Sequence, residues 1–186
     1  ARAFVGLIAS IAVFASLPFY LGDYFVGVAL SLLMWIALTQ SWVVLSAMTG
    51  YISLGHAVFF GAGAYIMVLC FGILPFWLSV IIAGLGCGLI ALLVGYPCLR
   101  VRGPYFVILT FGLAELVKFI VINTEAALGK FGRLLFGAPG LSDLFYVILG
   151  LAVTSMMITY LVRRSRFGAG LRAIRENEEA AETLGI

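Results

Sequence analysis

Long, uninterrupted apolar runs constrain this chain more than any other feature. They recur along most of the sequence at a length of about 20 residues, which is the length that a helix needs to cross a bilayer. Overall, 64% of the residues are hydrophobic and 10% are charged, whereas about 25% are charged in ordinary globular domains. Strands of a membrane β-barrel would instead alternate over about ten residues. We therefore expect an all-α, polytopic membrane protein.

The apolar runs predict about six membrane-spanning helices. The first run follows Arg2 and ends in Pro18-Phe19-Tyr20, which does not resemble a small-residue cleavage site, so we interpret it as a crossing and not as a signal peptide. The third run mixes glycines with Ser53 and His56, a composition that fits either a full crossing or a re-entrant segment beside a protected cavity. The six predicted helices lie near residues 3–21, 24–47, 54–72, 76–96, 104–122 and 143–162.

Arginines predict the orientation of these crossings. With six crossings, the segment between the fourth and fifth helices and the segment after the sixth fall on one side, together with Arg2 and both ends of the chain. The positive-inside rule makes that side cytoplasmic. We therefore divide the chain into a transmembrane region, 1–162, and a cytoplasmic segment, 163–186. The arginines of the two cytoplasmic segments are Arg100, Arg102, Arg163, Arg164, Arg166, Arg172 and Arg175.

The cytoplasmic segment has the pattern of an amphipathic helix. Leu171, Ile174, Ala181 and Leu184 form one apolar stripe, and the other faces are charged. Opposite charges stand four residues apart at 172 and 176 and at 175 and 179, a spacing that supports a helix. The glutamates of this segment would be repelled by anionic lipid, so a protein partner is favoured over the membrane surface.

Several kinds of chemistry are disfavoured by the sequence. Gly129-Lys130 lacks the other positions of a phosphate-binding loop, because Thr124 and Phe131 stand where a glycine and a hydroxyl are needed. His56 is the single histidine, and the three cysteines are scattered, so we expect no metal site. A net charge of +3 gives no indication of nucleic-acid binding.

Two polar pairs within apolar runs have alternative interpretations. Ser53 and His56 could form the nucleophile and base of an intramembrane hydrolase, but no third group that would orient the base is evident. Glu115 and Lys118 lie on one helical face at membrane depth. They could line a polar substrate path, or they could simply pair with each other while Lys118 extends toward the membrane surface.

Three stretches resemble permease subunits of branched-chain amino acid ABC importers. The first, SRFGAGLRAIRENEEAAETLGI at 165–186, resembles the cytoplasmic signature loop of that family. The second, GYISLGHAVFFGAGAY at 50–65, and the third, LRVRGPYFVILTFGLAELVK at 99–118, resemble two membrane motifs of the family. Related permeases for urea or short amides share much of this pattern. The sequence departs from it at Pro104, where an acidic residue is expected.

The resemblance implies a transport subunit and not an enzyme. ATP and Mg would be bound by two separate cytoplasmic ATPase subunits, and this chain would hold no cofactor of its own. The cytoplasmic segment would be the coupling helix that docks into the ATPase. The residues to which we assign that docking are Arg172, Arg175, Glu176, Glu179, Ala180, Ala181, Leu184 and Gly185.

The resemblance also implies a second, related permease subunit and a periplasmic substrate-binding protein, which would land on the predicted outer loop 123–142. The location would be the bacterial inner membrane, where the lipid surrounds the apolar helices. Leucine, isoleucine and valine need a path with apolar walls and a few polar groups, and our candidates for these groups are Ser53, His56, Glu115 and Asn123. Family members continue with further membrane helices, so we expect this chain to correspond to roughly two thirds of a permease.

Overall fold

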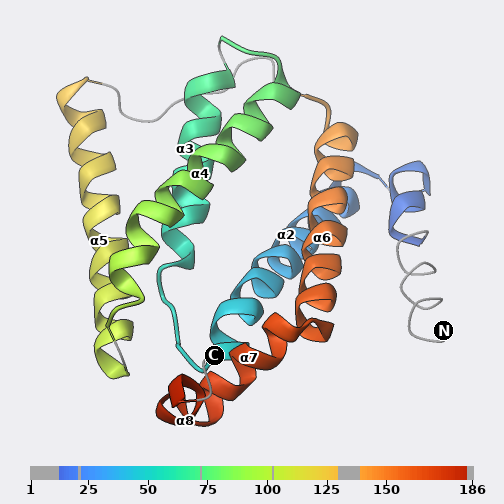
Figure 1. Cartoon of the computed structure of the whole chain (residues 1–186). Helices are drawn as coiled ribbons and strands as arrows, with labels where there is room; N and C mark the ends of the chain where they lie inside the picture. Colours follow the sequence, from blue (N-terminus) through green and yellow to red (C-terminus); the bar gives the residue numbers. More distant parts are fainter. Residues whose placement is uncertain (1–12, 21, 72, 102, 130–138, 184–186) are drawn as a thin grey trace. The chain divides into compact units, whose positions relative to one another are not determined.

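The computed structural model describes residues 13–20, 22–71, 73–101, 103–129 and 139–183. Within these residues the regular structure is helical throughout (Figure 1). The chain divides into two compact units, one formed by 1–50 and 139–186 and the other by 51–138. Besides a helical stretch at 13–20, the elements are α2 (Asp23–Trp42), the π-helix η1 (Val43–Ala47), α3 (His56–Phe71), α4 (Phe76–Cys98), α5 (Pro104–Ala127), α6 (Leu141–Arg164), α7 (Arg166–Glu176) and α8 (Glu178–Thr183).

Four of the described helical segments are long and apolar enough to cross a membrane. They are α2 continued through η1, α4, α5 and α6. The shorter α3 has 16 residues and therefore a length of about 24 Å, against a hydrocarbon core of about 30 Å. These segments confirm the predicted all-α, polytopic membrane fold. The first predicted crossing, 3–21, lies mostly outside the described residues.

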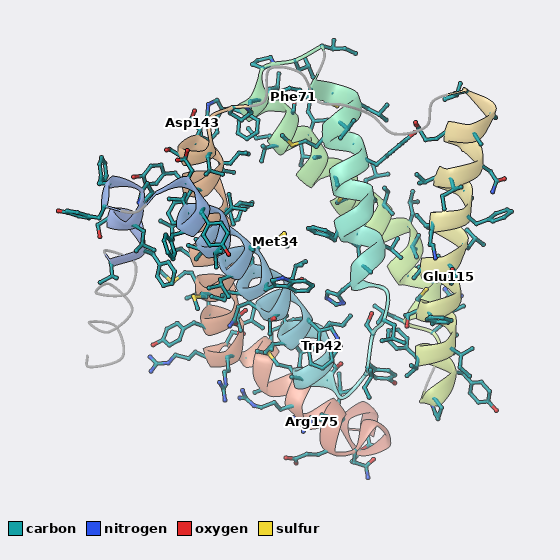
Figure 2. The ribbon with its side chains drawn as sticks, turned by 180° about the vertical axis from the view of Figure 1, so that it is seen from behind. Met34, Trp42, Phe71, Glu115, Asp143 and Arg175 are labelled. Carbon is teal, nitrogen blue, oxygen red and sulfur yellow. The ribbon has the colours of Figure 1, made fainter. Side chains whose placement is uncertain are left out.

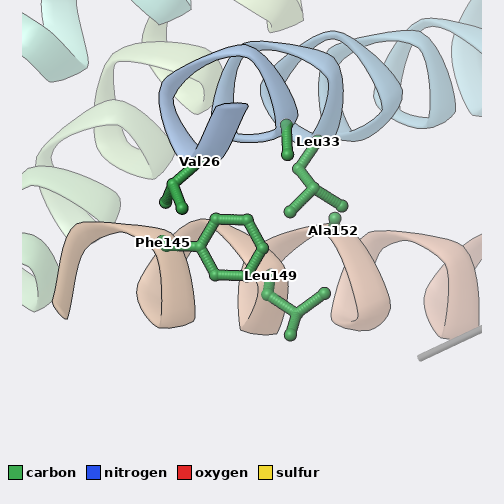
Figure 3. Packing of buried hydrophobic residues seen from close by; sticks show 6 residues of the cluster. Val26, Leu33, Phe145, Leu149 and Ala152 are labelled. Atoms are coloured by element: carbon green, nitrogen blue, oxygen red, sulfur yellow. The ribbon is translucent and has the colours of Figure 1, made fainter. Parts of the chain in front are cut away.

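In the first unit, α2 and α6 pack side by side in the same direction (Figure 1). Val26 lies beside Phe145, and Leu33 lies beside Ala152 (Figure 3). One step of seven residues further along each helix, the Thr159 hydroxyl donates a hydrogen bond to the carbonyl oxygen of Gln40 at 3.4 Å. Contacts that recur every seven residues on both helices define a parallel, coiled-coil-like seam. Phe145 has no exposed surface and packs in the first of these contacts, near the start of α6.

The end of α2 winds into a π-helix before the chain leaves the first unit. Thr49 Oγ1 donates to the carbonyl oxygen of Leu45 at 2.5 Å, and Ser46 is buried. Gly50 follows with φ +80°, a left-handed conformation in which glycine is favoured at helix ends. Because a π-helix has a wider turn than an α-helix, it changes which backbone carbonyls are left without a partner at the end of α2. π-helices often occur at functional sites.

In the second unit, α3 packs against α4 at glycines. A Cβ on Gly86 would stand 2.9 Å from Ile66 Cδ1, and one on Gly63 would stand 3.2 Å from Cys87 Sγ. The Cys87 thiol donates to the carbonyl oxygen of Phe59 at 3.3 Å. Small residues that let backbones approach are the usual means of helix packing in lipid, where van der Waals contact drives association.

Local chemistry at both ends of α5 sets its limits. Gly103, with φ +63°, precedes Pro104 at the first helical position, where the missing N–H and fixed φ of proline suit a helix start. The helix ends before Gly129, at φ +65°, a common left-handed helix stop. It therefore extends through 123–127, and the prediction that these residues belong to the outer loop is wrong. Residues 130–138 of that loop lie outside the described residues.

Candidate functional site

A tight corner joins α6 to α7. The Ser165 hydroxyl donates to the carbonyl oxygen of Val162 at 2.7 Å and accepts from the backbone N–H of Gly168 at 3.1 Å, so it caps the first turn of α7. A Cβ on Gly168 would stand 2.0 Å from the Val162 oxygen, which is far inside contact distance. The corner therefore needs a capping hydroxyl at 165 and a glycine at 168.

Two arginines fasten α7 to the membrane helices of its own unit. The Arg172 guanidinium donates to the carbonyl oxygen of Arg163, at the end of α6, at 3.0 Å. The Arg175 guanidinium donates to the carbonyl oxygen of Ala47, the last residue of the π-helix, at 2.8 Å. A Cβ on Gly50 would stand 3.2 Å from Arg175 Cγ, so a small residue there leaves room for the arginine. α7 thus contacts the ends of both helices of the parallel pair.

The segment after α6 forms two helices, α7 and α8, and not the single helix that the sequence predicted. Asn177 interrupts it with an extended backbone, φ −160° and ψ 108°, and its side-chain oxygen accepts from the N–H of Ala180 at 3.1 Å. Asparagine competes for backbone hydrogen bonds and is a preferred N-cap, which accounts for the break. Residues 175 and 179 therefore do not lie on one continuous helix, and the predicted apolar stripe changes direction at 177.

The described docking candidates differ in exposure. Arg172, Arg175, Glu176 and Ala180 are exposed, although both arginines also make the contacts given above. Ala181 is 2% exposed, so it packs within its own unit and can reach a partner only if α8 moves. The side chain of Glu179 lies outside the described part of the structure, as do Leu184 and Gly185. The docking assignment stays a prediction.

A cavity of about 640 Å³ lies between α3 and α5 in the second unit. Its walls are mostly small and aliphatic, and four polar or charged residues project from the two helices into the lining. This volume falls in the range of about 300–1,000 Å³ that is usual for small-molecule sites. The lining residues are Ala57, Val58, Gly61, Ala62, Ala64, Tyr65, Val68, Ala114, Glu115, Val117, Lys118, Val121, Ile122 and Glu125.

Glu115 and Lys118 form an ion pair in this lining. Lys118 Nζ lies 3.3 Å from Glu115 Oε2, and both side chains are more than half exposed. Glu115 is the twelfth of the 24 residues of α5, so it lies near the middle of the span (Figure 2). A charge at the centre of a membrane helix costs about 2.5–3.5 kcal/mol by insertion measurements. The structure therefore confirms the pairing that the sequence offered as one interpretation and also places the pair on a cavity wall.

A second polar contact connects the two walls of the cavity. The Tyr65 hydroxyl on α3 donates to Glu125 Oε1 on α5 at 2.5 Å. Neither residue has a role that its sequence position predicts. Glu125 was placed in a loop, and one tyrosine among eight carries little signal. Tyr65 lies seven residues after Val58, and Glu125 lies seven residues after Lys118. A seven-residue spacing places two residues on one face of a helix, and this was the available indication.

The remaining candidates for the substrate path occupy other surroundings. Ser53 is buried, and its hydroxyl oxygen accepts from the N–H of Gly55 at 3.3 Å. His56 is the first residue of α3, and Asn123 donates to the carbonyl oxygen of Phe119 at 2.8 Å. Glu115 is the one path candidate that lines the α3–α5 cavity. The assignments of Ser53, His56 and Asn123 stay predictions.

The described residues contain no cluster of three or more potential metal-ligating side chains from His, Cys, Asp and Glu. Two features of the described residues are candidates for function, the α7–α8 surface of the first unit and the charged cavity of the second.

Four apolar helices that are long enough to cross a membrane define a multi-pass membrane protein. Comparison with known proteins gives the family. Residues 24–186 match the family model described as "Branched-chain amino acid transport system / permease component", and the chain belongs to this family of transport permease subunits.

Two curated relatives carry the same printed name, "High-affinity branched-chain amino acid transport system permease protein LivM". The chain is 30% identical to the protein from Escherichia coli strain K12 and 28% identical to that from Salmonella typhimurium strain LT2. Each alignment covers 97% of this chain and 50% of the relative. The chain thus spans about half the length of the curated relatives it matches, less than the two thirds expected from sequence. No solved structure matches the chain.

Proposed function

We propose that this chain is part of a membrane-spanning subunit of an ATP-binding cassette importer that moves leucine, isoleucine and valine across the bacterial inner membrane. The observation that carries the proposal is the family match over 24–186, which includes both the spanning helices and the cytoplasmic segment. The relatives are named for branched-chain amino acid transport, and this favours that substrate over urea or short amides.

In this proposal, two separate ATPase subunits bind ATP and Mg and drive the permease between outward-facing and inward-facing states. α7 and α8 form the surface to which the ATPase subunits bind. Support comes from the contacts of α7 with the ends of both α6 and η1, since a helix attached to two spanning helices can transmit a displacement to both. Glu176 and Ala180 are exposed on this surface. Glu176 offers a charge to the ATPase, and the small side chain of Ala180 lets the ATPase approach the helix closely.

The proposed orientation places the α7–α8 end in the cytoplasm, because arginines concentrate there. A periplasmic binding protein would then deliver the amino acid to the opposite end, and a second permease subunit would complete the pathway. Exposed apolar side chains on α4 and α5, such as Leu92 and Phe119, are suited to contact lipid or that second subunit.

The test is uptake of labelled leucine into vesicles that contain the full-length permease pair, the ATPases and the binding protein. We expect uptake to depend on ATP. Glu176→Arg reverses an exposed charge on α7, and we expect it to abolish both uptake and co-purification of the ATPases. Asp143→Arg is the matched control, because Asp143 is an acidic residue in the first turn of α6, about 32 Å along the helix from its end.

The outcomes separate the parts of the proposal. ATPases that still co-purify with Glu176→Arg, together with normal uptake, would overturn the docking surface. Transport of urea or acetamide without leucine uptake by the wild-type complex would overturn the substrate.

A further inference from the structure

The α3–α5 cavity contains charges that the docking surface does not use. Glu115 and Lys118 are held 3.3 Å apart on the wall of this cavity, at the mid-point of a spanning helix. Ionisable side chains at this depth ordinarily face a bundle interior or a water-filled path. A simple structural pair would satisfy its charges without a cavity of about 640 Å³ beside it.

The charge pattern of this wall matches the backbone of a free amino acid. In an α-amino acid, a single carbon separates the ammonium group from the carboxylate, so the two charges are adjacent. Glu115 and Lys118 present the complementary charges, also adjacent, on one face of α5. A zwitterionic ligand can therefore separate this pair, so that its ammonium group contacts Glu115 and its carboxylate contacts Lys118. This exchange replaces the one ion contact between Glu115 and Lys118 with two contacts to the ligand.

The rest of the lining fits an aliphatic side chain. Ala57, Val58 and Ala62 on α3 face Val121 and Ile122 on α5. Alanines and Gly61 leave space beside the helix axis, whereas the valines and isoleucine provide apolar contact. The Tyr65–Glu125 hydrogen bond joins the two helices further along the cavity. It lies ten residues, or about 15 Å, from Glu115, so it is too distant to hold the same small ligand.

From this arrangement we propose that the α3–α5 cavity is a transient binding site for a zwitterionic, aliphatic amino acid on its way through the membrane, held by Glu115 and Lys118. The proposal rests on the proposed function and adds the location and chemistry of one step of the path. The site selects amino acids because a ligand without both charges, such as urea or a short amide, cannot replace the contact between Glu115 and Lys118.

The experiment removes both charges at once in the complete transporter. Glu115→Gln with Lys118→Met keeps side-chain volume and leaves no unpaired charge, so a purely structural pair should be replaceable in this way. We expect leucine uptake to fall about ten-fold or more, because two charged contacts to the ligand are lost. ATP hydrolysis stimulated by the binding protein should continue. Thr124→Val is the matched control on α5, because its hydroxyl bonds the carbonyl oxygen of Ile120 and its side chain is not part of the cavity lining.

The outcomes test the cavity site and the proposed transport function separately. Low uptake with retained ATP hydrolysis in the double variant supports the site. Uptake equal to that of the wild type would overturn the site and leave the proposed function intact. Loss of both uptake and stimulated hydrolysis would also overturn it, because the pair would then be needed for assembly. A wild-type complex that transports no leucine would overturn the proposed function itself.

Discussion

Gly168 lets the chain turn from α6 into α7 because a hydrogen stands where any other residue has a Cβ. The atoms that a Cβ would meet are the Val162 carbonyl oxygen at 2.0 Å and carbon at 2.9 Å. Both belong to the backbone, so they cannot rotate away as a flexible side chain could. The Ser165 cap bonds the same carbonyl oxygen, which fixes its position further.

Gly168→Ala should open the corner and displace α7. Overpacking of this kind costs about 1–3 kcal/mol where the surroundings can shift, and backbone atoms shift least. We expect a large loss of ATPase co-purification and of leucine uptake by the complete transporter, measured beside Gly150→Ala. Gly150 lies on α6, where a Cβ would meet no heavy atom within 4 Å, so its variant should behave as the wild type. Equal activity of the two variants would show that the corner does not position α7.

At the scale of the element, the two arginine contacts determine how firmly α7 follows the membrane helices. Arg172 reaches back to α6, its immediate neighbour in the chain, whereas Arg175 bridges 128 residues to Ala47. The covalent corner already links α7 to α6. Arg175 therefore adds a contact between α7 and the π-helical end of α2.

Arg175→Ala should weaken this link without removing the helix. A hydrogen bond to a charged donor contributes about 1.5–3 kcal/mol when it is sheltered, and the exposure of Arg175 places this one at the low end or below. The expected result is a lower ratio of leucine transported to ATP hydrolysed, with the ATPases still bound. Arg166→Ala removes the same charge from the same helix and should keep the wild-type ratio. An unchanged ratio in Arg175→Ala would count against a coupling role for the Ala47 contact.

The elements themselves were largely predictable, but their ends and side-chain contacts were not. Apolar runs located the four long spans to within about five residues, because hydrophobic length is a strong signal. The extension of α5 to Ala127 depends on Gly129 and on the bond between Glu125 and Tyr65. The break at Asn177 depends on a local cap, in which its side chain accepts from the Ala180 N–H. It was not predicted, because the apolar residues on either side have the spacing of one continuous helix. In the cavity, Glu115 and Lys118 were identified from their depth, whereas Tyr65 needed a tertiary contact.

At the scale of the whole molecule, the direction of α2 and α6 constrains the path of the chain between them. These two helices run parallel, as the ordered contacts of Val26 with Phe145 and Gln40 with Thr159 show. Parallel spans need an odd number of crossings between them. α4 and α5 account for two, so α3 supplies the third. A re-entrant α3 would make α2 and α6 antiparallel, so their parallel packing favours a full crossing over the re-entrant alternative left open by the sequence.

A full crossing by α3 places its two ends on opposite sides of the membrane. Ile52, before α3, and Ile73, after it, are both exposed, so a cysteine at either position can react with a maleimide. We expect a membrane-impermeant maleimide, applied to intact cells that carry a full-length, otherwise cysteine-free permease, to label Ile73→Cys. Ile52→Cys should be labelled only in inside-out vesicles, as should Leu99→Cys, because α4 returns the chain to that side. A re-entrant α3 would put residues 52 and 73 on the same side, and equal labelling of both in intact cells or in vesicles would contradict the crossing.

A full crossing by α3 also requires the segment 51–55 to lie within the membrane, because α3 is about 24 Å long and the hydrocarbon core is about 30 Å thick. In this segment the Leu54 N–H donates to the Thr110 hydroxyl of the second unit at 3.2 Å. The polar backbone of the segment is therefore partly satisfied within the membrane.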